Sequence, residues 1–159
     1  MRQTIYIETS IPSFYFDTRT TPAMMAKREW TRRFWDEERH RYELVTAAPT
    51  ILELESAPSP KRELTLGLVA EITELEPRDE ILDIVGFYLD HKLMPMEASG
   101  DAAHLAYASF YACDRLLTWN CKHLANSNKF EHIEVVNARL KPKKPKLITP
   151  LHLLNDELE

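Results

Sequence analysis

Short runs of β-branched and aromatic residues alternate along this chain with longer segments whose apolar residues recur at helical spacing. The runs cover residues 4–7, 44–47, 115–118, 133–137 and 147–149. Strands that alternate with helices are typical of right-handed crossovers between parallel strands. The sequence therefore predicts an α/β fold, a three-layer α/β/α sandwich with a central, mainly parallel sheet.

The segments between these runs predict the helices. Residues 22–42 show the first helical pattern, with Trp30, Phe34 and Trp35 as its apolar stripe. A helix beginning at Pro49 is ended by Pro58 and Pro60. The next pattern carries Leu64, Leu68, Ile72 and Leu75, and a further one after Pro77 carries Ile81, Leu82, Ile84, Val85, Tyr88 and Leu89.

A helix is expected over residues 101–113, with Ala102, Leu105, Ala106 and Ser109 on its packing face. The small residues on that face would let the helix lie close to its neighbours. Short helical segments are expected near residues 121–126 and 151–159. At 159 residues, without an internal repeat or linker, the chain fits one domain over residues 1–159.

Composition narrows the class of protein. A net charge of −5 argues against coating nucleic acid through overall positive potential. Cations cluster locally at Lys27, Arg28, Arg32, Arg33, Arg39 and Arg41, and in KPKKPK over residues 141–146. These clusters are interpreted either as solvated surface or as local patches that bind nucleic acid.

The chain is expected to be cytoplasmic and not bound to a membrane. No apolar stretch approaches the roughly 20 residues that span a bilayer, and the first apolar run is too short for a secretory signal. The two cysteines, Cys113 and Cys121, lack the spacing of a zinc site and are expected to be reduced thiols.

Acidic or amide side chains stand where several of these elements end or begin. Glu8 follows the first strand, Glu53 lies in the helix after the second, Asp101 opens a helix, and Asn120 follows residues 115–118. The carboxyl ends of parallel strands meet at one sheet edge, and Mg²⁺ prefers oxygen ligands. These residues therefore predict a divalent cation site.

Local alternatives remain for each candidate. Glu53 and Glu55 point about 200° apart on a helix, so only one faces a site. Asp101 is either the helix N-cap or, if Ser99 is the cap, a free carboxylate in the first turn. Asn120 either binds a metal-held water, positions substrate or forms a turn.

Three further residues are weaker candidates. His123 is interpreted as a phosphate donor or an acid or base, or else as a structural residue. Thr9 and Thr118 are candidates for hydrogen bonds to the acids or to a phosphate, although threonine is also a common strand former.

Four motifs resemble those of PIN-domain ribonucleases, and within them the VapC-like group. They are YIETSIPSFY (residues 6–15), TILELESA (50–57), GDAAHLAYA (100–108) and LLTWNCKHLAN (116–126). The resemblance covers most of the chain, and the last two motifs are the most specific. It implies a single PIN-like domain with an acidic pocket that holds Mg²⁺ or Mn²⁺ and cleaves single-stranded RNA.

By motif position, Glu8 stands where such domains usually carry their first aspartate, Glu53 at the helix glutamate and Asp101 at the next aspartate. Asn120 stands where many carry a fourth acid. The resemblance thus implies Glu8, Glu53 and Asp101 as metal ligands and Asn120 as a further catalytic residue. It also implies the toxin of a toxin-antitoxin pair, with a protein antitoxin and a homodimer as partners.

Other functions remain open on the sequence. One is a PIN fold with weakened catalysis that binds RNA or protein, for which Asn120 is the main argument. A receiver-like domain would need paired acids after the first strand, where Thr9 and Ser10 follow Glu8. A nucleotide-binding domain would need a glycine-rich phosphate loop, and the chain holds three glycines.

Overall fold

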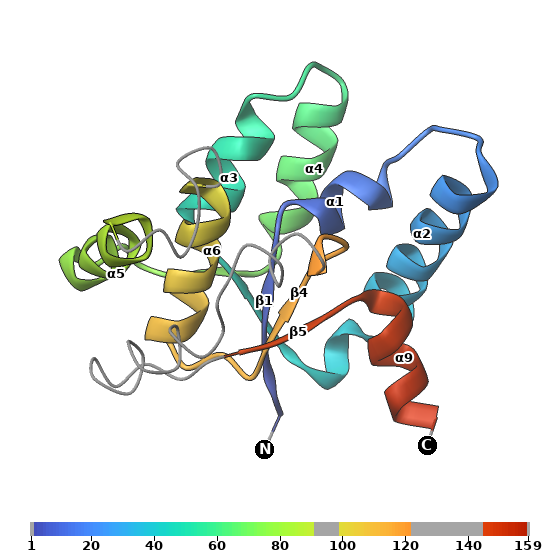
Figure 1. Ribbon diagram of the computed structural model, residues 1–159. Coiled ribbons are helices and arrows are strands. Elements are labelled where there is room, and N and C mark those ends of the chain that lie inside the picture. The colour runs from blue at the N-terminus through green and yellow to red at the C-terminus, as the bar shows by residue number, and fades with distance from the viewer. Residues whose placement is uncertain (1, 91–98, 122–144, 159) are drawn as a thin grey trace.

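A five-stranded parallel sheet forms the centre of the protein in a computed structural model that describes residues 2–90, 99–121 and 145–158. The strand order is β3-β2-β1-β4-β5, with every neighbouring pair parallel. The bounds are β1 Thr4–Ile7, β2 Glu43–Thr46, β3 Thr73–Glu74, β4 Arg115–Leu117 and β5 Lys146–Ile148. The predicted α/β fold is confirmed, and Figure 1 shows the strands running together between the helices.

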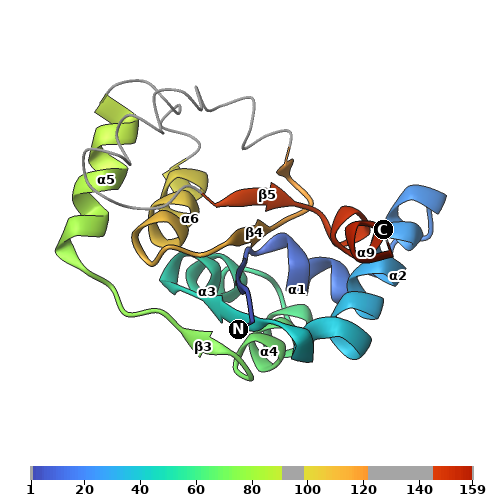
Figure 2. The same cartoon turned by 90° about the horizontal axis from the view of Figure 1, so that it is seen from below.

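Helices cover both faces of this sheet, which gives the three layers of the sandwich (Figure 2). They are α1 Ser10–Tyr15, α2 Pro22–Arg33, α3 Ala48–Glu55, α4 Lys61–Val69, α5 Asp79–Asp90, α6 Ser99–Phe110 and α9 Pro150–Leu158. Two short turns continue α2, the π-helical η1 Phe34–Glu38 and the 3₁₀-helical η2 Arg39–Arg41.

Side chains alternate between the two faces along each strand, as a pleated strand requires. Tyr6 of β1 packs in the cluster with α5 and α6, whereas its neighbours Ile5 and Ile7 pack with α1, η1 and α9 on the opposite face. Leu116 and Leu117 of β4 divide in the same way. The central strands are therefore buried on both sides, as expected for a parallel sheet between helices.

Several element predictions agree with the structure and others need correction. The first strand has its predicted bounds, and all four residues expected on the packing face of α6 are buried. The helix predicted through residues 64–75 instead ends at Val69 and is followed by β3. Because both β3 residues are exposed, this strand has no apolar alternation to reveal it.

The apolar stripe of the first long helix lies largely in the core. Phe34 and Trp35 are buried, and the partly buried Trp30 packs against the same cluster, although η1 and η2 replace the regular helix expected up to residue 42. On α5, Ile81 and Ile84 are buried, but Leu82 is 70% exposed and does not belong to the packing face.

Two predicted elements, the strand over 133–137 and the helical segment after residue 121, lie outside the described residues. Within the described ranges, no helix is long and apolar enough to cross a bilayer.

Candidate functional site

The carboxyl ends of β1 and β4 meet at the point where the chain changes its direction across the sheet. From β1 the chain adds β2 and β3 on one side, and then returns to add β4 and β5 on the other. Open parallel sheets bind their ligands outside the strand ends at such a point. Glu8 follows β1 here, and its N–H donates to the carbonyl of Leu117 at 3.2 Å.

The Glu8 side chain turns back to the start of α1 and is only 3% exposed. Both carboxylate oxygens accept from the Ser10 N–H, at 2.8 and 3.0 Å, and Oε1 accepts from the Thr118 hydroxyl at 3.1 Å. Burial raises the pKa of the Glu8 carboxyl, and the nearby Glu53 carboxylate raises it further, against the lowering effects of His104 and Ser10. Glu8 is therefore a buried acid whose charge is only partly compensated by the protein.

Two threonine hydroxyls fix the end of β1 to α3. Thr46 and Thr50 both donate to the carbonyl of Ile7, at 2.9 and 3.2 Å. Thr50 lies in the first turn of α3. Glu53 comes three residues later, so the two side chains are neighbours on the surface of the helix. This anchoring places the predicted helix glutamate beside the strand that carries Glu8.

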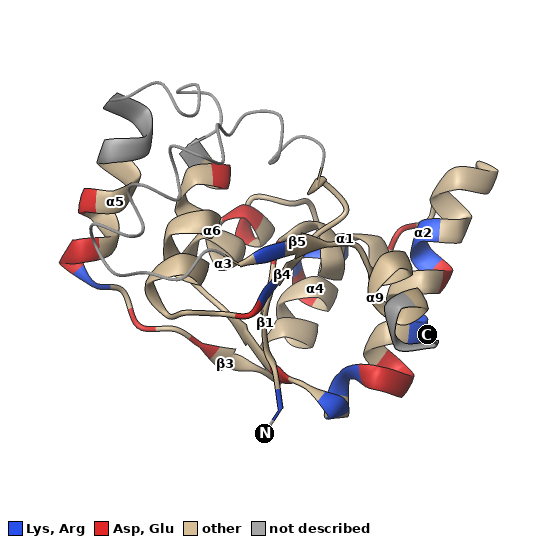
Figure 3. Cartoon of the chain, turned by 60° about the horizontal axis from the view of Figure 1, so that its bottom comes forward, with Lys and Arg blue, Asp and Glu red and all other residues tan. Residues whose placement is uncertain are grey.

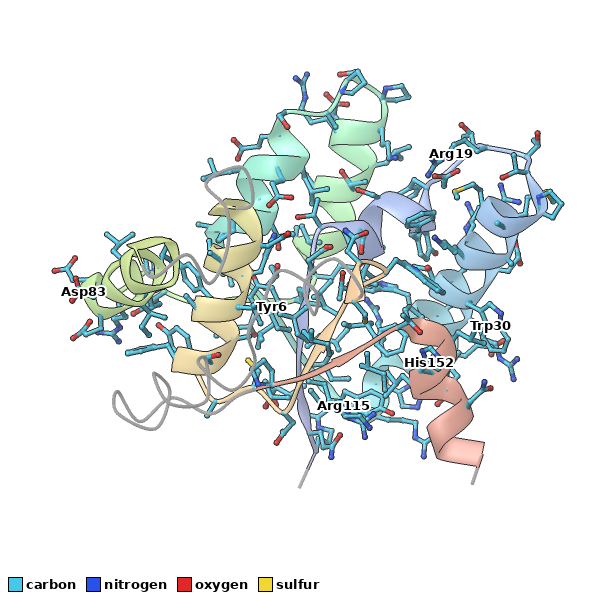
Figure 4. All side chains as sticks on the ribbon, viewed as in Figure 1. Tyr6, Arg19, Trp30, Asp83, Arg115 and His152 are labelled. Atoms are coloured by element: carbon cyan, nitrogen blue, oxygen red, sulfur yellow. The ribbon has the colours of Figure 1, made fainter. Side chains whose placement is uncertain are left out.

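His104 of α6 connects Glu53 to the sheet. Its Nε2 lies 2.8 Å from Glu53 Oε1, and its Nδ1 lies 2.8 Å from the hydroxyl of Tyr6. A carboxylate only accepts, so Nε2 carries the proton donated to Glu53, and in a neutral ring Nδ1 accepts from Tyr6. Tyr6 lies at the centre of the molecule, between β1 and α6 (Figure 4).

Glu53 differs electrostatically from Glu8. Partial burial alone raises the pKa of the Glu53 carboxyl, but the hydrogen bond and charge of His104, with a hydrogen bond from Thr9, hold it below the ordinary value. Its side chain is 43% exposed, so one side remains open to solvent. The two acids therefore combine a buried carboxyl with a raised pKa and an accessible carboxylate.

The first turn of α6 closes against Glu53. A Cβ atom added to Gly100 would lie 2.9 Å from Glu53 Oε1, closer than such contacts normally allow. The adjacent Asp101 belongs to this first turn, because α6 already begins at Ser99. Asp101 is thus not the N-cap, and it lies on the same helix face as His104, three residues later.

The residues after β4 line the site mainly through backbone and hydroxyl groups. Thr118 is fully buried, and its oxygen accepts the N–H of Asn120 at 2.9 Å while its hydroxyl donates to Glu8. Asn120 itself is exposed. Burial raises the pKa of Cys121 to about 11, so this thiol is protonated at neutral pH and is a poor nucleophile.

The structure brings some of the predicted site residues together and not others. Glu8, Glu53, Thr9 and Thr118 meet at the sheet edge with the first turn of α6 that carries Asp101, and Glu55 is exposed. His123 lies outside the described residues. Two participants were not predicted: Ser10, which reads as an ordinary helix start, and His104, whose position three residues after Asp101 is its only local signal.

No model of a known protein family matches the chain, and no curated protein matches it. Within the described ranges, no three side chains among His, Cys, Asp and Glu already form a metal-binding cluster.

The donors nevertheless fit a magnesium-like ion. Mg²⁺ keeps several waters and binds through one or two carboxylates together with substrate phosphates, so a complete protein cage is not needed. The buried carboxylate of Glu8, whose charge is only partly compensated, and the accessible oxygen atoms of Glu53 supply hard oxygen donors. The missing side chain of Gly100 leaves space for the Glu53 carboxylate against α6.

Proposed function

We propose that this protein is a Mg²⁺- or Mn²⁺-dependent endoribonuclease that hydrolyses phosphodiester bonds of single-stranded RNA. The observation that carries this proposal is the meeting of Glu8 and Glu53 with the first turn of α6, at the carboxyl ends of the central strands. The resemblance of the four motifs to PIN-domain ribonucleases supports the same reaction.

Glu8, Glu53 and Asp101 would hold the ion directly or through water. A bound divalent ion supplies a more acidic water and neutralises charge on the phosphodiester during in-line attack. The protein needs no nucleophilic side chain for this reaction, which agrees with the protonated thiol of Cys121.

The surrounding residues orient these acids. Ser10 and Thr118 hold the carboxylate of Glu8 through its hydrogen bonds, and His104 holds Glu53 against the sheet. The amide of Asn120 is exposed beside Thr118 and is available to a substrate phosphate or a metal-bound water. Preorganised ligands of this kind limit the reorganisation needed when the transition state forms.

A toxin that acts in the cytoplasm, inhibited by a protein antitoxin and active as a homodimer, is proposed on the resemblance alone. A binding module that has lost catalysis is the second candidate. It is favoured by one observation, namely that both oxygens of Glu8 already have hydrogen-bond donors within the protein.

An RNase assay with a fluorescent single-stranded RNA separates the two candidates. We expect cleavage that requires Mg²⁺ or Mn²⁺ and is lost in Glu8→Gln, Glu53→Gln and Asp101→Asn. Glu55→Gln is the matched control, because Glu55 is an exposed acid two residues from Glu53 on α3. Metal binding measured by thermal shift should follow the same pattern. Wild-type protein that neither binds Mn²⁺ nor cleaves RNA would leave the binding module as the function.

A further inference from the structure

Two aromatic rings and two cations gather beside the candidate site. The rings of Phe14 in α1 and Trp119 after β4 are 6.1 Å apart and meet edge to face. The Lys27 ammonium of α2 lies 5.3 Å from the Phe14 ring centre and 5.8 Å from that of Trp119. The Arg19 guanidinium lies 5.4 Å from the Phe14 ring centre. We call these four residues the aromatic-cation cluster.

Hydrogen bonds join this cluster to Glu8 through Ser10. The Trp119 N–H donates to Ser10 Oγ at 2.9 Å, and the Ser10 N–H donates to Glu8. The Trp119 indole N–H donates to Thr31 at 2.8 Å, and the Thr31 hydroxyl donates in turn to the carbonyl of Lys27 at 2.6 Å. The cluster is therefore built into the same framework as Glu8, on the side of α1 and α2.

The two cations differ in how much of their charge is compensated. Arg19 forms a two-pronged ion pair with the buried Asp17, with a closest N–O distance of 2.5 Å. Lys27 is half-buried over the rings, and among the described residues no carboxylate forms an ion pair with it. Figure 3 shows basic and acidic bands next to each other along α2. Because no ion pair of the described residues compensates Lys27, its ammonium is a local source of positive charge.

We propose that the aromatic-cation cluster binds one nucleotide of single-stranded RNA next to the acids, with the phosphate on Lys27 and the base against Trp119 and Phe14. This proposal rests on the proposed ribonuclease function and names the residues that hold its substrate. A chain with a net charge of −5 needs such a local cation to attract a phosphate toward an acidic site.

The residue types favour an unpaired strand. Stacking on aromatic rings needs a base that is free of a partner, and it tolerates every base because all have a π-face. A duplex would present phosphates to Lys27 but no base face to the rings. An acidic protein segment would likewise bind Lys27 but would have no base to stack on the rings.

Binding of a labelled single-stranded RNA oligonucleotide in EDTA tests the lysine without requiring catalysis. We expect Lys27→Gln to weaken binding several-fold and to lower the slope of log affinity against log salt by about 0.7, the value for one phosphate contact with a single strand. Lys27→Arg should retain binding. Arg33→Gln is the matched control, because Arg33 is an exposed cation on α2 that lies over the Trp30 ring.

Tryptophan fluorescence tests the rings. We expect RNA to quench the emission of wild-type protein and of Trp30→Phe, and the quenching to be largely lost in Trp119→Phe. Trp30 lies on α2, away from the β4 end (Figure 4).

Unchanged RNA affinity in Lys27→Gln, or unchanged quenching in Trp119→Phe, would overturn the proposal. So would a duplex, or a polyglutamate of equal length, that binds as tightly as the single strand. Failure of the ribonuclease function gives a different result: the wild type would bind the oligonucleotide in a Lys27-dependent way and leave it uncut with Mg²⁺.

Discussion

Replacing Glu8 with Gln should stabilise the metal-free protein while it abolishes cleavage. Glu8 is 3% exposed, and burial raises the pKa of its carboxyl, so the folded protein favours the uncharged form relative to water. Gln has nearly the same shape, and its carbonyl oxygen still accepts from Ser10 and Thr118. The substitution therefore removes a buried charge and leaves most of the local hydrogen bonding intact.

The expected magnitude follows from two opposing contributions. Burying an ion costs several kcal/mol, and a hydrogen bond to a charged group returns about 1.5–3 kcal/mol, here from the Ser10 N–H and the Thr118 hydroxyl. The difference is on the order of 1 kcal/mol in favour of the Gln variant at neutral pH. For a chain of 159 residues this corresponds to a rise in Tm of about 2–4 °C.

The gain should depend on pH in a defined direction. Because the folded-state pKa of Glu8 is raised, its favourable contribution is complete below the unfolded-state pKa and is lost as pH rises through the folded-state pKa. Gln does not ionise, so the variant does not lose stability in this way as pH rises. The difference in unfolding free energy between the variant and the wild type should therefore be smallest in acid and should grow toward neutral pH.

Divalent metal should reverse the order of stability. A ligand at one hundred times its Kd stabilises the folded state by about 2.7 kcal/mol, and only the wild type keeps the Glu8 ligand. The assay is thermal unfolding of both proteins across the acidic to neutral range, in EDTA and in Mn²⁺. A Gln variant that is less stable than the wild type in EDTA at pH 7 would refute the reasoning, because it would mean that the charged carboxylate stabilises the fold.

Three further substitutions test residues that position Glu8 and Glu53. Gly100→Ala should lower metal affinity in a Mn²⁺ titration, because its Cβ would lie 2.9 Å from Glu53 Oε1 and displace the carboxylate that His104 holds. The same displacement should offset the helix-propensity gain of Ala over Gly, so the Tm should change little. His104→Ala should cost about 2–4 kcal/mol in chemical denaturation, because it leaves a cavity and removes the His104 partner of the buried Tyr6 hydroxyl. Thr50→Val should lose about 1 kcal/mol in the same measurement, since the Ile7 carbonyl loses one of its two threonine donors.

Local sequence patterns predicted those parts of the fold in which buried residues follow strand or helix periodicity. The β1 strand has its expected bounds because a continuous β-branched and aromatic run is buried on both faces, and the small residues of α6 are buried where helical periodicity placed them. The exposed β3 strand has no such pattern, and pairing with β2 alone defines it.

The candidate site depends on contacts that sequence spacing does not contain. His104 lies 51 residues from Glu53 and 98 from Tyr6, so its role appears only when α6 packs against both α3 and β1. Ser10 is likewise unremarkable until Thr118, 108 residues away, reaches the same carboxylate. Tertiary packing, rather than local propensity, determines which polar residues share the site.

The neutral side chain of Asn120 is consistent with the burial and the partly compensated charge of Glu8. A longer acid than aspartate can turn back to the Ser10 N–H, and it is then held in a buried position with its charge only partly compensated. The Thr118 oxygen accepts from the backbone N–H of Asn120, and the Thr118 hydroxyl donates to Glu8. A further carboxylate at position 120 would therefore add a second negative charge close to that of Glu8. With Asn120, the edge carries Glu8, Glu53 and Asp101 as its acids. The fold tolerates the charge of Glu53 and Glu8 because His104 donates to Glu53, and the Ser10 N–H and the Thr118 hydroxyl donate to Glu8.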